Sequence, residues 1–273
     1  MAATLPQSVA GTGAGIDRDP ADSGIRELEE AADYEACADL QRRVWGEGYR
    51  DIVPGSLIKV SREVGGLCAG AFGPAGDLIG FVYGLTGVRS GRVVHWSHML
   101  AVDPAHRNCG VGRGLKLYQR KRLGVAGVSV MFWTFDPLVA RNAHLNLNRL
   151  GVVIEAYEPD MYPGTGSDLH AFGTDRLVAS WSVFGQSGEP TVGPGDVSAI
   201  GVWRGKPPSA GQRAIRVEIP VDAESMRAGA LDELREWRRS TRSAFMSLLG
   251  AGWMVTGFQN EGERRHYVLE RPG

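Results

Sequence analysis

The residues best suited to chemistry in this 273-residue chain lie between His98 and Gly114. An apolar run ends at Val102, and it is followed by an Asp-Pro break, an arginine, three closely spaced glycines and an amphipathic stretch with helical spacing. Small residues at a helix start leave backbone N–H groups free, and the helix dipole adds roughly half a positive charge there. The pattern therefore predicts a binding site for a phosphate or pyrophosphate.

The spacing of the glycines excludes two common phosphate-binding loops. A P-loop for nucleoside triphosphates requires G-x-x-x-x-G-K-S/T, and no such run occurs. A dinucleotide fingerprint requires its first glycine at the strand end, whereas seven residues separate Val102 from Gly110 here. What remains is an R-x-x-G-x-G loop from Arg107 to Gly112, or a glycine-rich connection that binds no ligand.

The elements that must position this loop follow from hydrophobic spacing and from Gly and Pro breaks. We expect helices over 31–45, 54–64, 111–124 and 140–150. We expect strands over 25–28, 66–72, 78–85, 93–102, 129–135, 152–157 and 176–184. A later strand over 214–219, a long helix with an apolar stripe from 230 to 248, and strands over 253–258 and 266–269 complete the chain.

Four segments are expected from these elements. Residues 1–24 are predicted to be a disordered tail, and 25–184 form the main domain. Residues 185–212 are half Gly, Pro and Ser and are predicted to be a linker, and 213–273 form a β-α-β-β extension that docks on the core. The long helix of the extension carries four arginines that we expect to be a solvated face paired with Glu233 and Glu236: Arg235, Arg238, Arg239 and Arg242.

Composition narrows the class of protein. A net charge of −1 and a pI near 6.6 give no electrostatic footprint for nucleic acid or a membrane surface. The three cysteines have no metal-binding or redox spacing, so a reduced, cytoplasmic setting and no metal are expected. No signal peptide and no apolar run of about 18 residues is present, which favours a soluble protein.

The loop at 107–112, the strand before it and the helix-Leu-Gly-Val-strand unit after it resemble the GNAT superfamily of acyl-coenzyme A N-acyltransferases. The resemblance covers about 25–184. Four further stretches look like one branch of predicted acetyltransferases with a C-terminal extension: His98–Val102, Trp133–Leu138, Arg141–Ala143 and Asp175–Leu177. The implied fold class is α/β (α+β), with a mixed, mostly antiparallel central sheet flanked by helices.

The resemblance also implies how a donor is held. Acetyl-CoA or another acyl-CoA would be the co-substrate, with its pyrophosphate on the backbone N–H groups of 108–114 and its pantetheine arm along 100–102. In the family the strand over 93–102 commonly splays from the strand over 131–135, and coenzyme A enters the gap. The implied cofactor-binding residues are Leu100, Ala101, Val102, Arg107, Asn108, Cys109, Gly110, Val111, Gly112, Arg113, Gly114 and Asn142.

The implied reaction is attack of a neutral amine on a thioester. An alkylammonium with a pKa of about 10.4 costs about 4 kcal/mol to deprotonate at pH 7.4, so a general base is expected. His98 is the first candidate, because a period of two places it on the same strand face as Leu100 and the pKa of imidazole suits proton acceptance. His95, on the opposite face, is a weaker candidate. Tyr162 and Tyr157 are candidates for the acid that protonates the leaving thiolate.

The leading hypothesis is an N-acyltransferase for a small amine such as an amino acid or metabolite, with acetyl as the default acyl group and succinyl as an alternative. A protein N-terminal or lysine acetyltransferase is the second enzyme class, although the polar loop over 158–173 and the extension favour a covered acceptor side. A non-enzymatic acyl-CoA sensor is the third reading. A homodimer is left open.

Overall fold

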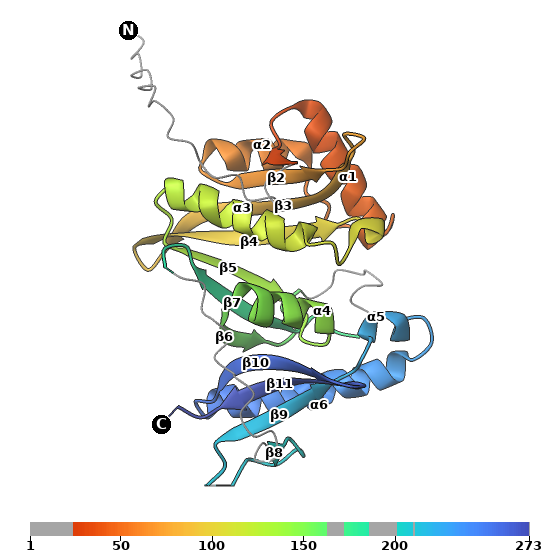
Figure 1. Cartoon of the computed structure of the whole chain (residues 1–273), viewed down its shortest axis with the longest axis vertical. Helices are drawn as coiled ribbons and strands as arrows, with labels where there is room; N and C mark the ends of the chain where they lie inside the picture. Colours follow the sequence, from red (N-terminus) through yellow and green to blue (C-terminus); the bar gives the residue numbers. More distant parts are fainter. Residues whose placement is uncertain (1–23, 163–171, 186–200, 210, 273) are drawn as a thin grey trace.

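The computed structural model describes residues 24–162, 172–185, 201–209 and 211–272. Its main feature is a seven-stranded sheet in the order β1-β2-β3-β4-β5-β7-β6 (Figure 1). All neighbouring strands are antiparallel except β4 and β5, which confirms the expected mixed, mostly antiparallel sheet. The strands are β1 (Ile25–Glu27), β2 (Leu67–Phe72), β3 (Leu78–Arg89), β4 (Arg92–Val102), β5 (Val130–Phe135), β6 (Val153–Glu158) and β7 (Arg176–Ser182).

Two helices cover one face of the first strands. Helix α1 (Ala31–Trp45) begins with a reciprocal capping box between Glu30 and Asp33 and ends at Gly46, which has a positive φ of 93°. Helix α2 (Gly55–Glu63) follows after a proline at the N-cap. The buried side chains of both helices pack in one hydrophobic cluster against the β3 and β4 residues Phe81, Tyr83, Met99 and Ala101.

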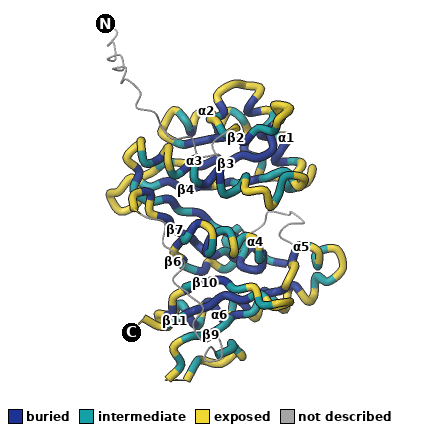
Figure 2. Tube along the Cα trace, in the orientation of Figure 1, coloured by how far each residue is buried: buried dark blue, intermediate teal, exposed yellow. Residues whose placement is uncertain are grey.

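Helix α3 (Val111–Val125) covers the opposite face of the same strands. Its Leu115 is buried in a cluster with Ala69 of β2 and Val82 of β3, and Leu100 of β4 packs against that cluster. The sheet is therefore sandwiched between α1 and α2 on one side and α3 on the other (Figure 1). Buried residues follow the strands between the helices (Figure 2).

Strand β4 carries a bulge at His98. Tyr83 of β3 is paired with Met99, but the next residue, Gly84, is paired with Ser97, so His98 is the extra residue. The insertion reverses the side-chain alternation on β4. Ser97 faces α3, where it is hydrogen-bonded to α3 side chains, whereas Met99 packs in the cluster under α1.

The parallel pair β4 and β5 forms a fork. The two strands are paired only from Val94 with Val130 to Trp96 with Phe132. Beyond that point β4 remains paired with β3 and β5 remains paired with β7, so the two strands diverge. This is the splay that the resemblance predicts.

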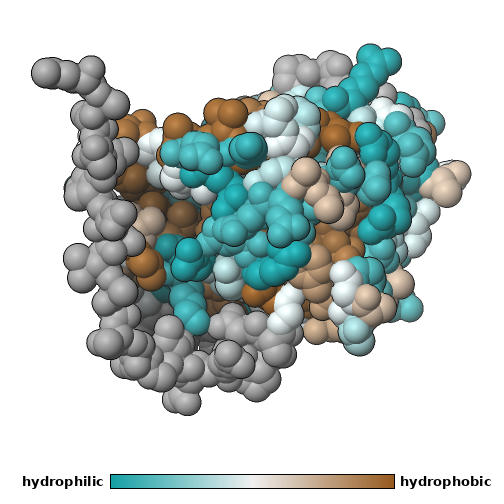
Figure 3. Space-filling model, turned by 90° about the horizontal axis from the view of Figure 1, so that it is seen from above, coloured by the Kyte–Doolittle hydropathy of each residue, from teal (hydrophilic) through white to brown (hydrophobic). Residues whose placement is uncertain are grey.

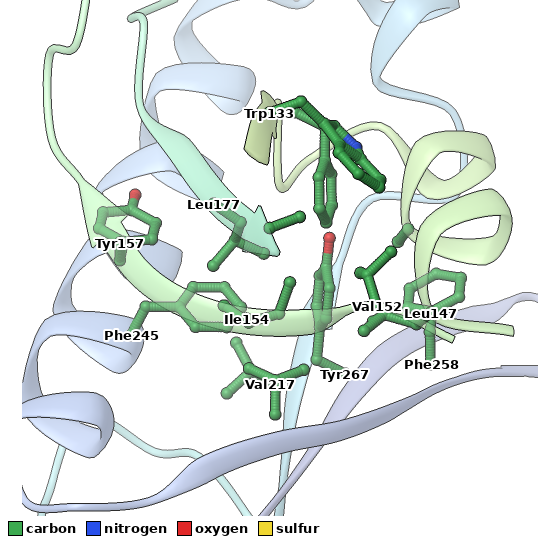
Figure 4. Packing of buried hydrophobic residues seen from close by; sticks show 14 of the residues in the cluster. Trp133, Leu147, Val152, Ile154, Tyr157, Leu177, Val217, Phe245, Phe258 and Tyr267 are labelled. Carbon is green, nitrogen blue, oxygen red and sulfur yellow. The ribbon is translucent and has the colours of Figure 1, made fainter. Parts of the chain in front are cut away.

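The second half of the chain adds another sheet, in the order β10-β11-β9-β8. Its strands are β8 (Gly201–Val202), β9 (Ala214–Ile219), β10 (Met254–Glu261) and β11 (Arg264–Glu270), and its helices are α5 (Ala223–Met226) and α6 (Leu231–Gly250). In Figure 1 this sheet and α6 lie next to β6. Figure 4 shows side chains of both halves in one core, where Tyr157 of β6 stacks on Phe245 of α6 with ring centroids 5.3 Å apart.

Ion pairs also join the two halves. Arg238 of α6 binds both carboxylate oxygens of Asp136 at 2.8 Å, and Arg242 binds Asp175 and Asp160. The expected solvated arginine face is therefore only half right. Arg235 and Arg239 form exposed pairs within α6, with Asp232 and Glu236, whereas the other two arginines hold the extension to the core.

Most expected elements are found within a few residues, and two parts differ. The strand β8 lies in the segment expected to be a linker, and the short helices α5 and η2 (Pro104–His106) were not expected. The expected 140–150 helix consists of α4 (Ala140–Ala143) and a π-helical segment η3 (His144–Leu150), which ends at Gly151 with a φ of 65°. The expected N-terminal tail except Gly24, residues 163–171 of the polar loop, and residues 186–200 and 210 of the expected linker lie outside the described residues.

Candidate active site

A strongly basic cavity of about 560 Å³ surrounds the start of α3. It is lined by the end of β4, the glycine loop and the α4–η3 helix. The residues predicted to bind the cofactor that line it are Leu100, Ala101, Val102, Arg107, Asn108, Gly110, Val111, Gly112, Arg113 and Asn142. Among the described residues that line it there are also Arg141, Arg149 and two histidines, and none is a carboxylate. A chain of net charge −1 thus concentrates four arginines at a helix N-terminus.

Two of the predicted cofactor-binding residues, Cys109 and Gly114, do not line this cavity. Gly114 is buried, and its N–H donates to the Gly110 carbonyl at 2.9 Å as the first bond of the helix. Cys109 is exposed, does not line the cavity, and its thiol donates to the Arg107 carbonyl at 3.4 Å. Because helical N–H groups first find partners at the fourth residue, the N–H groups free for an anion are those of Val111 and its two successors, not Gly114.

The loop fits a phosphate group by two further observations. The Nε of Arg113 is buried and has no hydrogen-bond partner among the described residues, so an acceptor at this point would satisfy it. A Cβ built on Gly112 would have only ordinary contacts, the nearest being Val102 at 3.7 Å, so packing within the chain does not require a glycine here. A ligand that lies directly against the backbone would require one.

A second cavity, of about 670 Å³, opens at the fork between β4 and β5. It is lined on the β4 side by Ser97 to Leu100 and on the β5 side by Trp133 to Phe135. It shares seven residues with the first cavity: Val44, Trp45, Leu100, Arg107, Arg141, Asn142 and Leu145. The two cavities therefore form one path from the basic helix start to the fork.

His98 lines the fork cavity on the α1 side of the sheet. Its ring makes an edge contact with Tyr83, with centroids 6.3 Å apart, and Tyr83 belongs to the cluster under α1 and α2. Leu100 packs on the α3 side, so the expectation that both residues share a face is wrong, because the bulge shifts the alternation. Desolvation lowers the pKa of His98 from 6.5, and the carboxylate of Asp51 opposes the shift.

His95 is a buried structural residue. Its Nδ1 lies 2.9 Å from Thr86 Oγ1 and its Nε2 lies 3.0 Å from the amide nitrogen of Gln119. Because an amide nitrogen only donates, Nε2 is the acceptor and Nδ1 carries the proton. Burial, and to a smaller extent Lys116, lowers the pKa of His95 to about 4, so the ring stays neutral. It does not line the fork cavity.

Lys116 of α3 lines the fork cavity although it is 2 % exposed. Its Nζ donates to Ser97 Oγ at 2.8 Å and lies 3.8 Å from the centroid of the Trp133 ring. Burial lowers its pKa well below 10.5. No cue for a site residue was seen at this position in the sequence, because a lysine in an amphipathic helix is usually solvated.

The two tyrosines occupy different environments. Tyr162 lines the fork cavity, and its hydroxyl is 3.1 Å from Thr134 Oγ1. Tyr157 is buried in the core and donates its hydroxyl to Asp175. Burial and the Asp175 carboxylate raise the pKa of Tyr157 far above 10, and it does not line the cavity. The structure therefore does not support Tyr157 as an acid at this site.

The fork cavity carries charges of both signs. Asp51, Asp136 and Glu224 line it together with Arg176 and Arg227. Among the described residues no cluster of His, Cys, Asp and Glu is placed to hold a metal ion. In the same part of the chain, no helix is long and apolar enough to cross a membrane.

Comparison with known proteins gives a similarity in structure that covers 58–59% of this chain in the matches described below. No protein-family model and no curated protein sequence matches the chain. Solved structures that match include the ribosomal-protein-S18-alanine N-acetyltransferase from Escherichia coli, at 18% identity over 59% of this chain and 94% of that one, with a TM-score of 0.45. An acetyltransferase of the GNAT family from Streptococcus pneumoniae matches at 18% identity over 58% and 98%, with a TM-score of 0.47. An aminoglycoside 6'-N-acetyltransferase complexed with coenzyme A matches at 16% identity over 59% and 98%, with a TM-score of 0.43.

The fold is assigned from features of this structure itself, independently of those matches. These features are the strand order, the single parallel pair that diverges into a fork, and the glycine loop at the start of the helix that packs behind that fork. These are the arrangement that the sequence resemblance predicts. The chain has the GNAT fold.

Proposed function

We propose that the chain is an acyl-CoA-dependent N-acyltransferase, with acetyl as the default acyl group and the amine of a small molecule as the acceptor. The observation that carries the proposal is the continuous path of two cavities, from four arginines at a helix start to a histidine at the fork. The arginines at the start of α3 suit phosphate groups, and His98 at the fork suits proton transfer. The diverging strands β4 and β5 leave an opening between these two ends.

The residues of the path would hold the donor in an extended form. The free N–H groups of Val111 to Arg113, with the arginine side chains around them, would bind the pyrophosphate. The unpaired edge of β4 beyond Trp96 faces the fork and offers backbone groups for the pantetheine amides, in the manner of an added strand. The thioester would supply the electrophilic carbonyl.

His98 is proposed as the general base. Its lowered pKa keeps the ring neutral at pH 7, so it can accept the proton of an ammonium acceptor directly or through water. Its position on the α1 side of the fork separates it from the phosphate end on the α3 side. The acceptor would therefore approach from the α1 side, where Asp51 and Tyr49 also line the cavity.

The mixed charges of the fork cavity favour an acceptor that itself carries both signs. Carboxylates such as Asp51 attract an ammonium group, and Arg176 and Arg227 attract a carboxylate. A free amino acid or a related small zwitterion has both groups. Tyr162, whose hydroxyl lies in the same cavity, is the proposed acid for the leaving thiolate.

Mass spectrometry of coenzyme A release tests the function. Acetyl-CoA and succinyl-CoA are each incubated with the full chain and pooled amino acids and amines, and acylated products are identified by mass. We expect release that depends on an amine, and a roughly hundredfold fall in kcat/KM for His98→Gln, the usual contribution of a general base. Binding of acetyl-CoA without acylation of any amine, together with unchanged behaviour of His98→Gln, would overturn the enzyme assignment.

A further inference from the structure

The fork cavity contains an amine that the proposed mechanism does not use. Lys116 reaches the point where β4 and β5 diverge, beside Ser97 and Trp133, which are the first residues of each strand beyond the last pair. Asn146, which accepts a hydrogen bond from the Trp133 indole at 2.9 Å, completes the surroundings. The side chain is thus held by one partner from each of the two diverging strands.

Its surroundings do not neutralise a charge. No carboxylate among the described residues forms an ion pair with Lys116, and its one hydrogen-bond acceptor there is the Ser97 hydroxyl. An ammonium without a counter-ion is costly to bury, so such a lysine gives up its proton more readily than a solvated one. Burial accordingly lowers its pKa well below 10.5.

A hydrogen-bond network fixes the orientation of the Ser97 hydroxyl, the acceptor for Lys116. Ser97 donates to the Gln119 carbonyl oxygen at 2.8 Å, so its lone pairs are left for Lys116. The Gln119 amide nitrogen donates to His95, and His95 donates to Thr86. The donor and acceptor of each hydrogen bond in this network are therefore fixed, and the network holds Nζ of Lys116 in place.

Lys116 and His98 approach the same cavity from opposite faces of the sheet. Ser97, the partner of Lys116, faces α3, whereas His98 contacts Tyr83 on the α1 side. The bulge is what allows successive β4 residues to serve the two sides. A reacting centre inside the fork would have a proton acceptor on each side.

We propose that Lys116 is a second proton-transfer residue of this site. Its amine takes a second proton from the acceptor nitrogen, after the one that His98 accepts, and resupplies the Tyr162 hydroxyl that protonates the departing sulfur. The inference rests on the proposed acyltransferase function. As the C–N bond forms and the C–S bond breaks, one proton passes from nitrogen to Nζ and the Tyr162 hydroxyl gives its proton to the thiolate. The proton on Nζ then returns to the Tyr162 oxygen. Lys116 ends each turnover in its starting state.

The titratable groups of neighbouring elements do not offer a second proton acceptor on the α3 side of the fork. On β4, His95 is neutral and fully hydrogen-bonded, and His98 lies on the other side of the fork. Trp133 of β5, Asn146 of η3 and Gln119 of α3 do not titrate. The remaining charged groups of the fork cavity are Asp51, Arg107, Asp136, Arg141, Arg176, Glu224 and Arg227.

The test compares Lys116→Met, which keeps the length of the side chain but cannot carry a proton, with Lys116→Arg, which keeps a charge but cannot release one at neutral pH. Lys121→Met is the matched control, since Lys121 lies on the same helix and is exposed. We expect kcat to fall about a hundredfold in both Lys116 variants, with the KM for acetyl-CoA changed less than threefold and one ionisation lost from the kcat–pH profile. Lys121→Met should match the parent chain.

A second measurement needs no turnover. The chain has four lysines, so an NMR spectrum of protein labelled at lysine Nζ can follow each one through a pH titration. Lys116 is expected to titrate well below the other three. Turnover within threefold of the parent chain in Lys116→Met, full activity in Lys116→Arg, or a Lys116 pKa near 10.5 would each overturn the inference. Absence of any turnover in the parent chain would instead overturn the proposed function, and the NMR titration would still report on Lys116.

Discussion

Replacing Gly112 by alanine separates the stability of the fold from the binding of phosphate. Gly112 is the second residue of α3, and an added Cβ would lie 3.7 Å from Val102, 3.8 Å from Leu100 and 4.0 Å from Leu145. These are ordinary van der Waals distances, so nothing in the chain must move. Alanine in place of glycine restricts the unfolded chain and should stabilise the protein by about 0.4–1 kcal/mol.

The effect on a bound pyrophosphate should have the opposite sign. The new methyl group would enter the cavity at the point where the free N–H groups face it. Losing one hydrogen bond to a charged group costs about 1.5–3 kcal/mol, which corresponds to about a tenfold to a hundredfold loss of affinity for coenzyme A. We therefore expect a Gly112→Ala protein that melts slightly higher and binds coenzyme A much more weakly.

Calorimetric titration with coenzyme A and thermal unfolding measure the two quantities. Acetyl-pantetheine, which lacks the pyrophosphate, is the control substrate, and its kcat/KM should be nearly unchanged. Gly110→Ala is the contrasting variant for stability, because Gly110 has a φ of 87° and a Cβ there should lower the melting temperature, at a cost of about 1–2 kcal/mol. Wild-type affinity for coenzyme A in Gly112→Ala would refute the placement of the pyrophosphate.

Three further predictions concern groups outside the phosphate loop. Arg238→Met removes a buried guanidinium, leaves the partly buried Asp136 without its main partner, and should lower the free energy of unfolding by about 3 kcal/mol. The exposed Arg239→Met should change it by less than about 0.5 kcal/mol in denaturant titrations. The folded-state pKa of His95, about 4, lies below its unfolded value of about 6.5. The free energy of unfolding should therefore be highest above pH 6.5 and fall by about 3 kcal/mol towards pH 4, because the unfolded state binds the proton first. A His95→Asn protein that loses the same amount over this range would contradict this. Tyr157→Phe should lower the free energy of unfolding by about 1–2 kcal/mol and leave kcat unchanged. Tyr162→Phe should lower kcat and leave the melting temperature unchanged. The reverse pattern would support Tyr157, not Tyr162, as the acid.

Hydrophobic periodicity was sufficient for the elements that have one solvated face. The bounds of α1 and of β9 agree with expectation to the residue, because apolar positions repeat at 3.6 in one and at 2 in the other and strong breakers follow both. Strand β8 was missed because its two residues lie in a run of Gly, Pro and Ser, and it exists only by pairing with β9. Tertiary pairing of this kind leaves no local pattern.

The shape of the candidate site was predictable from the sequence at the glycine loop and less so at the fork. Sequence spacing placed the loop and the residues around it, because backbone N–H groups follow from helix geometry alone. The bulge at His98 could not be predicted, since an extra residue in one strand has no signature of its own, and it reversed the assigned face of the histidine. Lys116 was missed for a related reason. It shares a helix face with Gln119 and Leu123, at spacings of three and seven, and that face is buried.

The ion pairs of α6 give a structural role to two carboxylates of the core. Asp136 and Asp175, which lie in two of the stretches that resemble the acetyltransferase branch, are the carboxylates that Arg238 and Arg242 bind. A shortened chain that ended after β7 would expose the apolar side of β6 and leave Asp175 without its arginine. Asp136 also lines the fork cavity, so such a shortened chain would alter the charge of that cavity as well. The extension thus supplies part of the wall of the fork cavity, through Glu224 and Arg227, and a substitution in α6 is expected to act on the cavity through the core carboxylates that α6 binds.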